Sequence, residues 1–364
     1  MARNVRINLF TTAFILICIG IVMIYSASSI YSWERYKDSL FFLKRHLGFF
    51  VIGIFLTLLV MGIDYRKFKR WAKPLLIFSF LLLVLVLIPG IGREVAGARR
   101  WFRWKFISFQ PSELTNIAII IYIADFIARK CEYIRTFLRG FLPPVFVLGA
   151  TALLILAQPD LGSVLALGIV VFIMLFVSGA RPTYLLSVII ASLPLLYILI
   201  FSVPYRRARI MSFLNPWSDP KGSGFQIIQS QVALGSGGIF GVGLGQSRQK
   251  LFYLPAAHTD FIFSIIGEEL GLIGTMSVII LFMIFIREGL KIMKNAPDKF
   301  AYFLSLGLVL MISLKAIINI GVSCGVLPTK GLPLPFISYG GSSFILDMVS
   351  IGILMNIGRS GEYP

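Results

Sequence analysis

About ten runs of apolar residues dominate this sequence, and each is long enough to cross a lipid bilayer. A transmembrane α-helix needs about 17–25 mostly apolar residues. The runs cover residues 8–29, 46–62, 74–90, 113–128, 142–158, 162–178, 184–203, 260–286, 300–324 and 343–358. The chain is 57% hydrophobic, more than a soluble domain of 364 residues needs. The sequence therefore predicts an all-α polytopic membrane protein with about ten transmembrane helices in a single integral-membrane domain, residues 1–364.

The loops between these runs predict which side of the membrane each one faces. An even number of spans places both termini on the same side. Lys and Arg are almost equally numerous on the two sides, but they are denser in the shorter loops at 66–73, 129–139 and 287–299, and short loops weigh most in the positive-inside rule. We therefore predict cytoplasmic termini and a large extracytoplasmic loop, residues 204–259, between the seventh and eighth helices.

A net charge of +18 suggests an anionic partner. The basic residues are scattered over short loops and form no continuous face, which argues against nucleic acid. Two alternatives stay open for the cations predicted outside: contact with anionic lipid headgroups, or binding of a diphosphate, which needs several donors. The cysteines, Cys18, Cys131 and Cys324, lack CxxC spacing and argue against a disulfide framework or a zinc site.

Residues 97–113 interleave aromatic and basic side chains before an expected helix start. Pro111 suits the first turn of a helix, and Glu113 suits its positive end. One interpretation is an interfacial amphipathic segment with tryptophan at the bilayer surface. The other is that Arg100 and Trp101 grip the headgroup of a lipid-linked ligand.

Asp160 lies in a Gln-Pro-Asp-Leu-Gly turn between two apolar runs. A carboxylate in this position is costly unless it caps a helix or faces a wet cavity. Asp directly before an apolar run is a common N-cap, so a cap and a substrate site both stay open.

The predicted extracytoplasmic loop ends in His-Thr-Asp, residues 258–260, directly before an apolar run. The loop is basic, and its repeated glycines could let the backbone approach an anion closely, although it has no phosphate-binding loop pattern. Asp260 is either the N-cap of the next helix or a general base whose pKa can rise at a low-dielectric boundary. Glu268 and Glu269 follow at a costly depth, either as functional groups or as partners that hold the fold.

Residues 327–343 are rich in Pro and Gly. They are too irregular for a plain loop and too apolar for a solvated one. A re-entrant element buried in protein fits this composition.

Together these segments resemble one known family, the SEDS proteins (shape, elongation, division and sporulation), which include FtsW, RodA and SpoVE. The resemblance covers nearly the whole chain, in order, and NPWSDP and SRQKLFYLP look more similar to the FtsW branch than to the RodA branch. The matching segments are GARRW at 97–101, FQPSE at 109–113, QPDLG at 158–162, NPWSDPKGSGFQ at 215–226, GVGLGQSRQKLFYLP at 241–255, HTDFIFSIIGEELG at 258–271, NIGV at 319–322 and LPTKGLPLPFISYGGSS at 327–343.

The resemblance implies a peptidoglycan glycosyltransferase that polymerises lipid II outside the cytoplasmic membrane. Its expected partners are a class B penicillin-binding protein, as transpeptidase, and other division-complex membrane proteins. Asp260 would be the catalytic carboxylate. The expected substrate-binding residues are Arg100, Trp101, Glu113, Asp160, Arg206, Arg207, Lys250, His258, Glu269, Lys330 and Ser338.

The residue types agree with that chemistry. A polyprenyl diphosphate leaves readily once its charge is neutralised, so the enzyme needs a base for the acceptor hydroxyl and cations for the diphosphate. It does not need the paired carboxylates of a glycosidase. A divalent cation, Mg²⁺ or Mn²⁺, could share the charge, although the sequence shows no closed metal site and leaves the metal's ligands unknown.

Two positions depart from the family pattern. Asn116 stands where the family usually has Lys, and Ala256 where it usually has Glu. Conversely, Lys315 lies in a predicted helix where the family tends to have Gln, and Asp347 lies in the last predicted helix. Lys315 could restore the cation missing at position 116, or it could pair with Asp347 as a structural couple.

Two other functions remain alternatives. A lipid II flippase would be expected to show related halves with helices interrupted near the midplane, whereas the segments above gather at one membrane face. A weakly active scaffold of a division complex stays open because Asn116 and Ala256 remove charge from the expected site.

Overall fold

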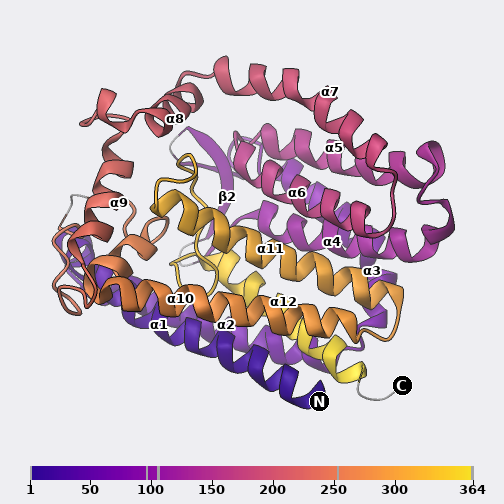
Figure 1. Cartoon of the computed structure of the whole chain (residues 1–364), viewed down its shortest axis with the longest axis horizontal. Helices are drawn as coiled ribbons and strands as arrows, with labels where there is room; N and C mark the ends of the chain where they lie inside the picture. Colours follow the sequence, from indigo (N-terminus) through magenta and orange to yellow (C-terminus); the bar gives the residue numbers. More distant parts are fainter. Residues whose placement is uncertain (1, 96, 105–106, 252–253, 362–364) are drawn as a thin grey trace.

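The computed structural model describes residues 2–95, 97–104, 107–251 and 254–361, so Phe252 and Tyr253 of the GVGLGQSRQKLFYLP segment lie outside the described residues. The chain forms a bundle of α-helices with one small sheet (Figure 1). In chain order the elements are α1 (Ala2–Tyr36), α2 (Phe41–Gly62), α3 (Arg66–Leu85), β1 (Arg93–Val95), β2 (Ala98–Trp104), β3 (Ile107–Phe109), α4 (Pro111–Lys130), α5 (Leu142–Leu156), α6 (Leu161–Val177), α7 (Pro182–Phe201), α8 (Pro204–Leu214), α9 (Phe225–Ser236), α10 (Ile262–Lys294), α11 (Lys299–Ser323) and α12 (Gly341–Ser360).

Each apolar run predicted from the sequence contains a helix. In the described part of the chain, 8 helices are long and apolar enough to cross a membrane: α1, α2, α4, α5, α7, α10, α11 and α12. The other two runs hold α6, which is apolar but shorter, and α3, which begins with several basic residues. The prediction of an all-α, multi-pass membrane protein is confirmed. Some helices, such as α1 and α10, extend beyond their apolar runs, because backbone hydrogen bonding can continue beyond the bilayer surface.

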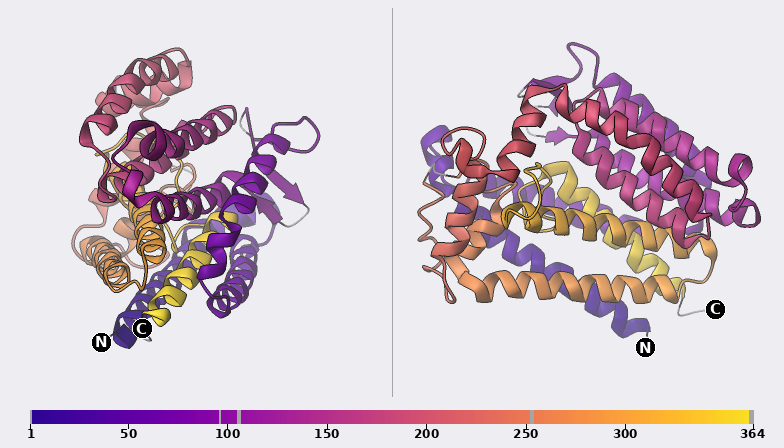
Figure 2. Two further views of the ribbon diagram at one scale, coloured as in Figure 1. Left: turned by 90° about the vertical axis from the view of Figure 1, so that its right-hand side faces the viewer. Right: turned by 45° about the horizontal axis from the view of Figure 1, so that its top comes forward.

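The two termini lie at the same end of the bundle, as an even number of spans requires, and α8 and α9 lie at the opposite end (Figures 1 and 2). We call these the terminal end and the loop end. The predicted loop at 204–259 is partly helical, because it contains α8 and α9.

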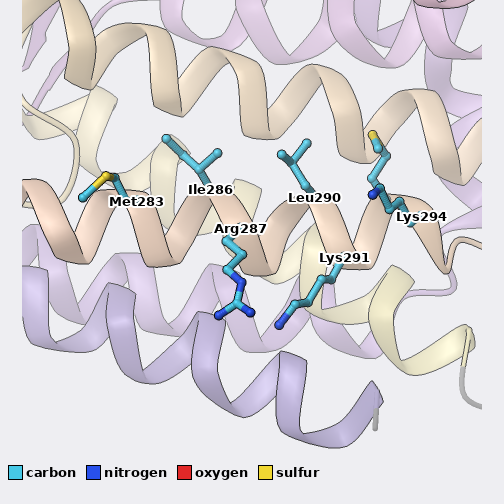
Figure 3. Close-up of a pocket in the computed structure, with 7 residues that line it drawn as sticks. Met283, Ile286, Arg287, Leu290, Lys291 and Lys294 are labelled. Atoms are coloured by element: carbon cyan, nitrogen blue, oxygen red, sulfur yellow. The ribbon is translucent and has the colours of Figure 1, made fainter.

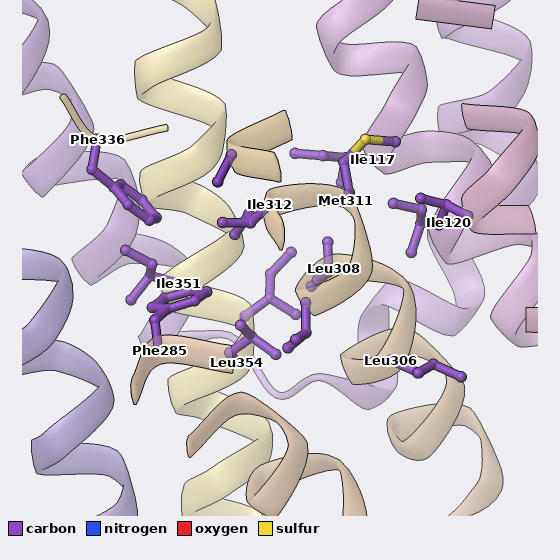
Figure 4. Close-up of a cluster of buried hydrophobic side chains, with 14 of the residues drawn as sticks. Ile117, Ile120, Phe285, Leu306, Leu308, Met311, Ile312, Phe336, Ile351 and Leu354 are labelled. Atoms are coloured by element: carbon purple, nitrogen blue, oxygen red, sulfur yellow. The ribbon is translucent and has the colours of Figure 1, made fainter. Parts of the chain in front are cut away.

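The buried centre of the bundle consists mainly of α4, α11 and α12. In its most apolar stretch α4 is 83% buried, whereas α7 at the periphery is 6% buried. Side chains of α4, α10, α11 and α12 meet in the core around Ile120, Leu308 and Ile351, together with Phe336 from the segment before α12 (Figure 4). Because α7 packs on little protein, its apolar surface is left for lipid.

The strands β1, β2 and β3 form a three-stranded antiparallel sheet, in the order β1-β2-β3, that the sequence did not predict. Phe102 pairs with Phe109 across β2 and β3, and Gly97, with φ +76°, makes the turn between β1 and β2. The interleaved basic and aromatic side chains that suggested an interfacial segment lie mostly on β2. Successive side chains of a strand point to opposite faces, so such a mixture can be divided between the two faces of the sheet.

The segment between α11 and α12 turns back into the bundle, so the predicted re-entrant element is confirmed. Phe336 and Ile337 are 1% and 0% exposed. Gly20 of α1 lies against this segment, where a Cβ would come within 2.7 Å of the Ile337 Cα. The irregular backbone is thus enclosed by protein, as it must be at membrane depth.

Candidate active site

Asp260 lies in the turn before α10, and neighbouring elements clamp its backbone. Its N–H donates to the Ala256 carbonyl at 3.1 Å. From α11, Asn319 Nδ2 donates to the carbonyls of Asp260 and Leu332, both at 2.8 Å. The turn before α10 and the re-entrant segment are therefore held together beside the Asp260 side chain.

The Asp260 carboxylate itself receives no hydrogen bond from the residues that the structure describes. The N-cap of α10 is Phe261, so the alternative that Asp260 caps the helix is wrong. A Cβ at Gly331 would lie 2.9 Å from Asp260 Oδ2, so a larger residue there would push the carboxylate away from the re-entrant segment. The carboxylate is left available for another group.

Burial raises the pKa of Asp260 to about 6, while the positive charge of Arg209 acts in the opposite direction. Two residues earlier, burial lowers the pKa of His258 to about 4, so its imidazole is neutral at pH 7. Asp260 therefore has the properties of a general base: ionised at neutral pH, yet more basic than an exposed aspartate.

Lys330, the residue before Gly331 in the re-entrant segment, provides a cation. Its Nζ donates to the Gly162 carbonyl, in the turn before α6. Burial lowers the pKa of Lys330 to about 8, and the charges of Asp160 and Glu113 oppose that shift. Lys330 thus stays protonated at pH 7 but is close to losing its charge.

Asp160 is the N-cap of α6, which confirms one of its two interpretations. It accepts hydrogen bonds from Ser163 N at 3.1 Å and from Ser163 Oγ at 2.8 Å. Arg100 holds the same turn from β2, with Nε donating to the Gln158 carbonyl at 2.7 Å and Nη2 to the Pro159 carbonyl at 2.5 Å. Arg100 is thus engaged within the protein, and its neighbour Trp101 lies half-buried in β2.

Arg209 of α8 completes the group, and the sequence analysis did not single it out. Its Nη1 approaches the Thr329 carbonyl at 3.4 Å, and the side chain is otherwise exposed. Thr329 directly precedes Lys330 and Gly331. Residues 329–331 therefore link the three side chains through one short segment: Thr329 contacts Arg209, Gly331 lies against Asp260, and Lys330 between them extends to the Gly162 carbonyl. We take Arg209, Lys330 and Asp260 as the candidate active site.

A signal for Arg209 exists in the sequence. Arg206 and Arg209 are three residues apart on α8, so they share a face, and both guanidinium groups lie over the Tyr205 ring, at 5.6 and 5.8 Å. Arg206 also donates to the Leu199 carbonyl at 2.9 Å, whereas Arg207 is exposed on another face. Helical periodicity groups Arg209 with Arg206 rather than with Arg207.

Lys250 and Glu269 form a buried ion pair, 2.9 Å long, away from this group. Ser26 of α1 donates to Glu269 at 2.7 Å. Glu268 accepts from Ser247 Oγ and from the Arg248 N–H, the latter at 2.8 Å. The interpretation that both glutamates hold the fold therefore agrees with the structure, while substrate contact by Lys250 or Glu269 stays a prediction.

Glu113 is also paired inside the bundle. Lys315 Nζ lies 2.7 Å from Glu113 Oε2 and 3.1 Å from Asp347 Oδ1, and it donates to Ser343 Oγ at 3.2 Å. The predicted Lys315–Asp347 couple is present and is extended by Glu113 to a triad. Asn116 lies beside it, 6% exposed, and its Oδ1 has no hydrogen-bond partner among the residues that the structure describes.

His258 and Ser338 position the turn that carries Asp260. Ser338 Oγ donates to the Thr259 carbonyl at 2.6 Å and accepts from the Leu334 N–H at 2.9 Å. The His258 ring packs 4.5 Å from the Phe42 ring. Both predicted site residues therefore lie next to Asp260 in the chain or in space, and the structure gives each a positioning contact.

A groove of about 490 Å³ runs along the other half of α10, lined by Met283, Ile286, Arg287, Leu290, Lys291, Met293 and Lys294 (Figure 3). It begins more than twenty residues after Asp260, toward the terminal end. Its lining is mostly apolar and lies on a membrane-spanning helix, so we do not assign the chemistry to it.

Comparison with known proteins agrees with the fold. The chain is 47% identical over 342 residues to the probable peptidoglycan glycosyltransferase FtsW of Geobacter metallireducens, covering 94% of this chain and 91% of that protein. It is 44% identical over 349 residues to stage V sporulation protein E of Bacillus subtilis, covering 96% and 95%.

Solved structures show the same architecture. One is a chain from work on the structural coordination of polymerization and crosslinking by a peptidoglycan synthase complex, with TM-score 0.80, 29% identity and 98% of both chains covered. Another is the rod shape determining protein RodA of Thermus thermophilus, with TM-score 0.72, 26% identity, and 98% and 97% covered. The family of FtsW, RodA and SpoVE, described as cell cycle proteins, matches residues 6–363. With that match over almost its whole length, this chain belongs to the FtsW/RodA/SpoVE family.

Proposed function

We propose that the protein is a peptidoglycan glycosyltransferase that polymerises lipid II at the outer face of the cytoplasmic membrane during cell division. The observation that carries the proposal is the buried Asp260 carboxylate, whose pKa burial raises to about 6, with the charge of Arg209 acting on it and Gly331, the neighbour of Lys330, lying against it. The activity named for the FtsW relatives supports the same reaction.

Transfer of a sugar from lipid II requires one base and a neutralised leaving group. Asp260 accepts the proton of the acceptor hydroxyl as that oxygen bonds to the anomeric carbon of the donor. The bond from this carbon to the diphosphate oxygen breaks, and its electron pair leaves on the undecaprenyl diphosphate. Arg209 and Lys330 stabilise the departing negative charge, so no second carboxylate is needed as an acid.

A divalent cation, Mg²⁺ or Mn²⁺, would have to be held mainly by the substrate. The described residues include no group of three or more His, Cys, Asp or Glu side chains that could hold a metal ion, so they do not fit a site made by protein alone. We therefore derive no catalytic step from a metal.

The proposed partners are a class B penicillin-binding protein and other division-complex membrane proteins. The similarity to a chain of a peptidoglycan synthase complex supports the first of them. We place the loop end outside and the terminal end in the cytoplasm, because the short terminal-end loops are the denser in Lys and Arg.

The test is polymerisation of labelled lipid II by the protein and its transpeptidase partner in liposomes. Asp260→Asn should lower the rate by about 100-fold or more, since general bases typically contribute that much. Asp219→Asn is the matched control, because Asp219 is an exposed aspartate in the loop that precedes Asp260. Its carboxylate accepts a hydrogen bond from the Ser223 N–H at 2.8 Å. Transport of lipid II without polymer would instead indicate a flippase. Partner binding with neither activity would indicate a scaffold.

A further inference from the structure

α10 is broken at Gly271, and residues 238–243, which we call the hook, fill the break. Gly271 has φ +67° and ψ −159°, far from helical values. The backbone N–H and C=O groups that lose their helical partners at the break form hydrogen bonds with the backbone of the hook instead. The hydrogen bonds run from Val242 N to Glu268 O at 2.9 Å, from Gly243 N to Glu269 O at 3.1 Å, from Leu272 N to Gly238 O at 2.9 Å and from Ile273 N to Ile239 O at 3.2 Å.

The contacts of Glu269 give the height of the break in the bundle. Its carboxylate accepts a hydrogen bond from Ser26, which lies inside the first apolar run of the sequence, residues 8–29. The break is therefore level with the last turns of a membrane-spanning segment, rather than out in the aqueous loop. Irregular backbone at such a depth must have its polar groups paired within the protein, and the hook provides that pairing.

The hook turns large apolar side chains outward. Ile239 is 60% exposed, Phe240 79% and, just after the hook, Leu244 57%. On the adjoining part of α10, Leu272 and Ile273 are 55% and 52% exposed. Because backbone hydrogen bonds join the hook to these positions, the two exposed surfaces are continuous, and the α10 part belongs to a membrane span.

We propose that residues 238–244 lie within the bilayer at the loop end, with Ile239, Phe240 and Leu244 in contact with lipid acyl chains. An exposed apolar surface of this kind, continuous with a lipid-facing helix, fits hydrocarbon rather than water. The hook is tied to α10 a few turns after Asp260, so the contact also fixes the height of the candidate active site relative to the lipid. The proposal does not depend on the reaction that the site performs.

Depth-dependent fluorescence quenching tests the proposal in liposomes. The three cysteines are replaced by serine, and Phe240→Cys is labelled with a small fluorophore. Quenchers are supplied either on lipid acyl chains or as iodide in water. Ile280→Cys on α10, where the native side chain is 46% exposed, is the lipid-facing control, and Lys221→Cys is the exposed aqueous control in the same loop.

The label at 240 should resemble the label at 280: severalfold stronger quenching from the acyl chains than at 221, and weaker quenching by iodide. Iodide quenching equal to that at 221 would place the hook in water. Insensitivity to both quenchers would mean that another protein or a second copy covers it. Either result overturns the proposal, provided that the label at 280 stays lipid-accessible and so reports a folded bundle.

Discussion

Two glycines let the titratable side chains of the candidate site lie against backbone. A Cβ at Gly331 would come within 2.9 Å of Asp260 Oδ2, and one at Gly162 would clash with the Lys330 Cε. Each contact removes water from one side of a charged group. This desolvation is the cause that moves the pKa values of Asp260 and Lys330 toward neutrality.

We expect a bell-shaped pH profile for lipid II polymerisation. The pKa of Asp260 is raised to about 6, so below that pH the carboxyl holds a proton and cannot accept another. The pKa of Lys330 is lowered to about 8, so above that pH the cation is lost. The measurement is kcat/KM from about pH 5 to pH 9, and a flat profile across this range would contradict both assignments.

Arg209→Gln should lower polymerisation and move the acid limb of that profile to higher pH. The positive charge of Arg209 favours the ionised form of Asp260, so its removal lets the pKa of Asp260 rise further. Arg207→Gln is the matched control, because Arg207 is exposed one turn or less away on the same helix. An acid limb that stays in place in Arg209→Gln would show that Arg209 does not act on the base.

At the scale of elements, the triad of Glu113, Lys315 and Asp347 joins α4, α11 and α12 at the buried centre. Lys315→Gln leaves two buried carboxylates without a cation, and breaking a buried pair in this way typically costs about 3–5 kcal/mol. We expect a clear fall in the midpoint of thermal unfolding in detergent.

Asn116→Lys in the Lys315→Gln background should recover part of that loss. Asn116 lines the same small cavity as Glu113, Lys315 and Asp347, so a cation from α4 can reach the carboxylates. Asn116→Lys alone is the control, and it should not stabilise, because Lys315 already occupies the site. If the midpoint of thermal unfolding of the double variant is no higher than that of Lys315→Gln, a cation at position 116 cannot replace Lys315. The idea that Lys315 restores the cation missing at position 116 then fails.

At the scale of the whole molecule, apolar length alone predicted where each membrane helix lies, because a helix in lipid must satisfy its own backbone. The strands at 93–109 were missed because their short pairing is set by a turn at Gly97 rather than by composition. For the site, Asp260 and Lys330 were predicted from the resemblance. Which basic residue faces Asp260 depends on how α8 packs on residues 329–331, and local sequence does not encode that contact.

Sidedness is the property of the whole molecule on which the proposed reaction depends. The proposed reaction takes place outside the cytoplasm, so it requires that the loop end face outward. We expect a cysteine at Lys221 in a cysteine-free background to react with a membrane-impermeant maleimide in intact cells. A cysteine at Lys294, exposed near the terminal end of α10, should react only after permeabilisation. The reverse pattern would put Asp260 and its cations in the cytoplasm, where the base would meet no acceptor strand, and the proposed reaction would fail even though the fold and the family assignment would stand.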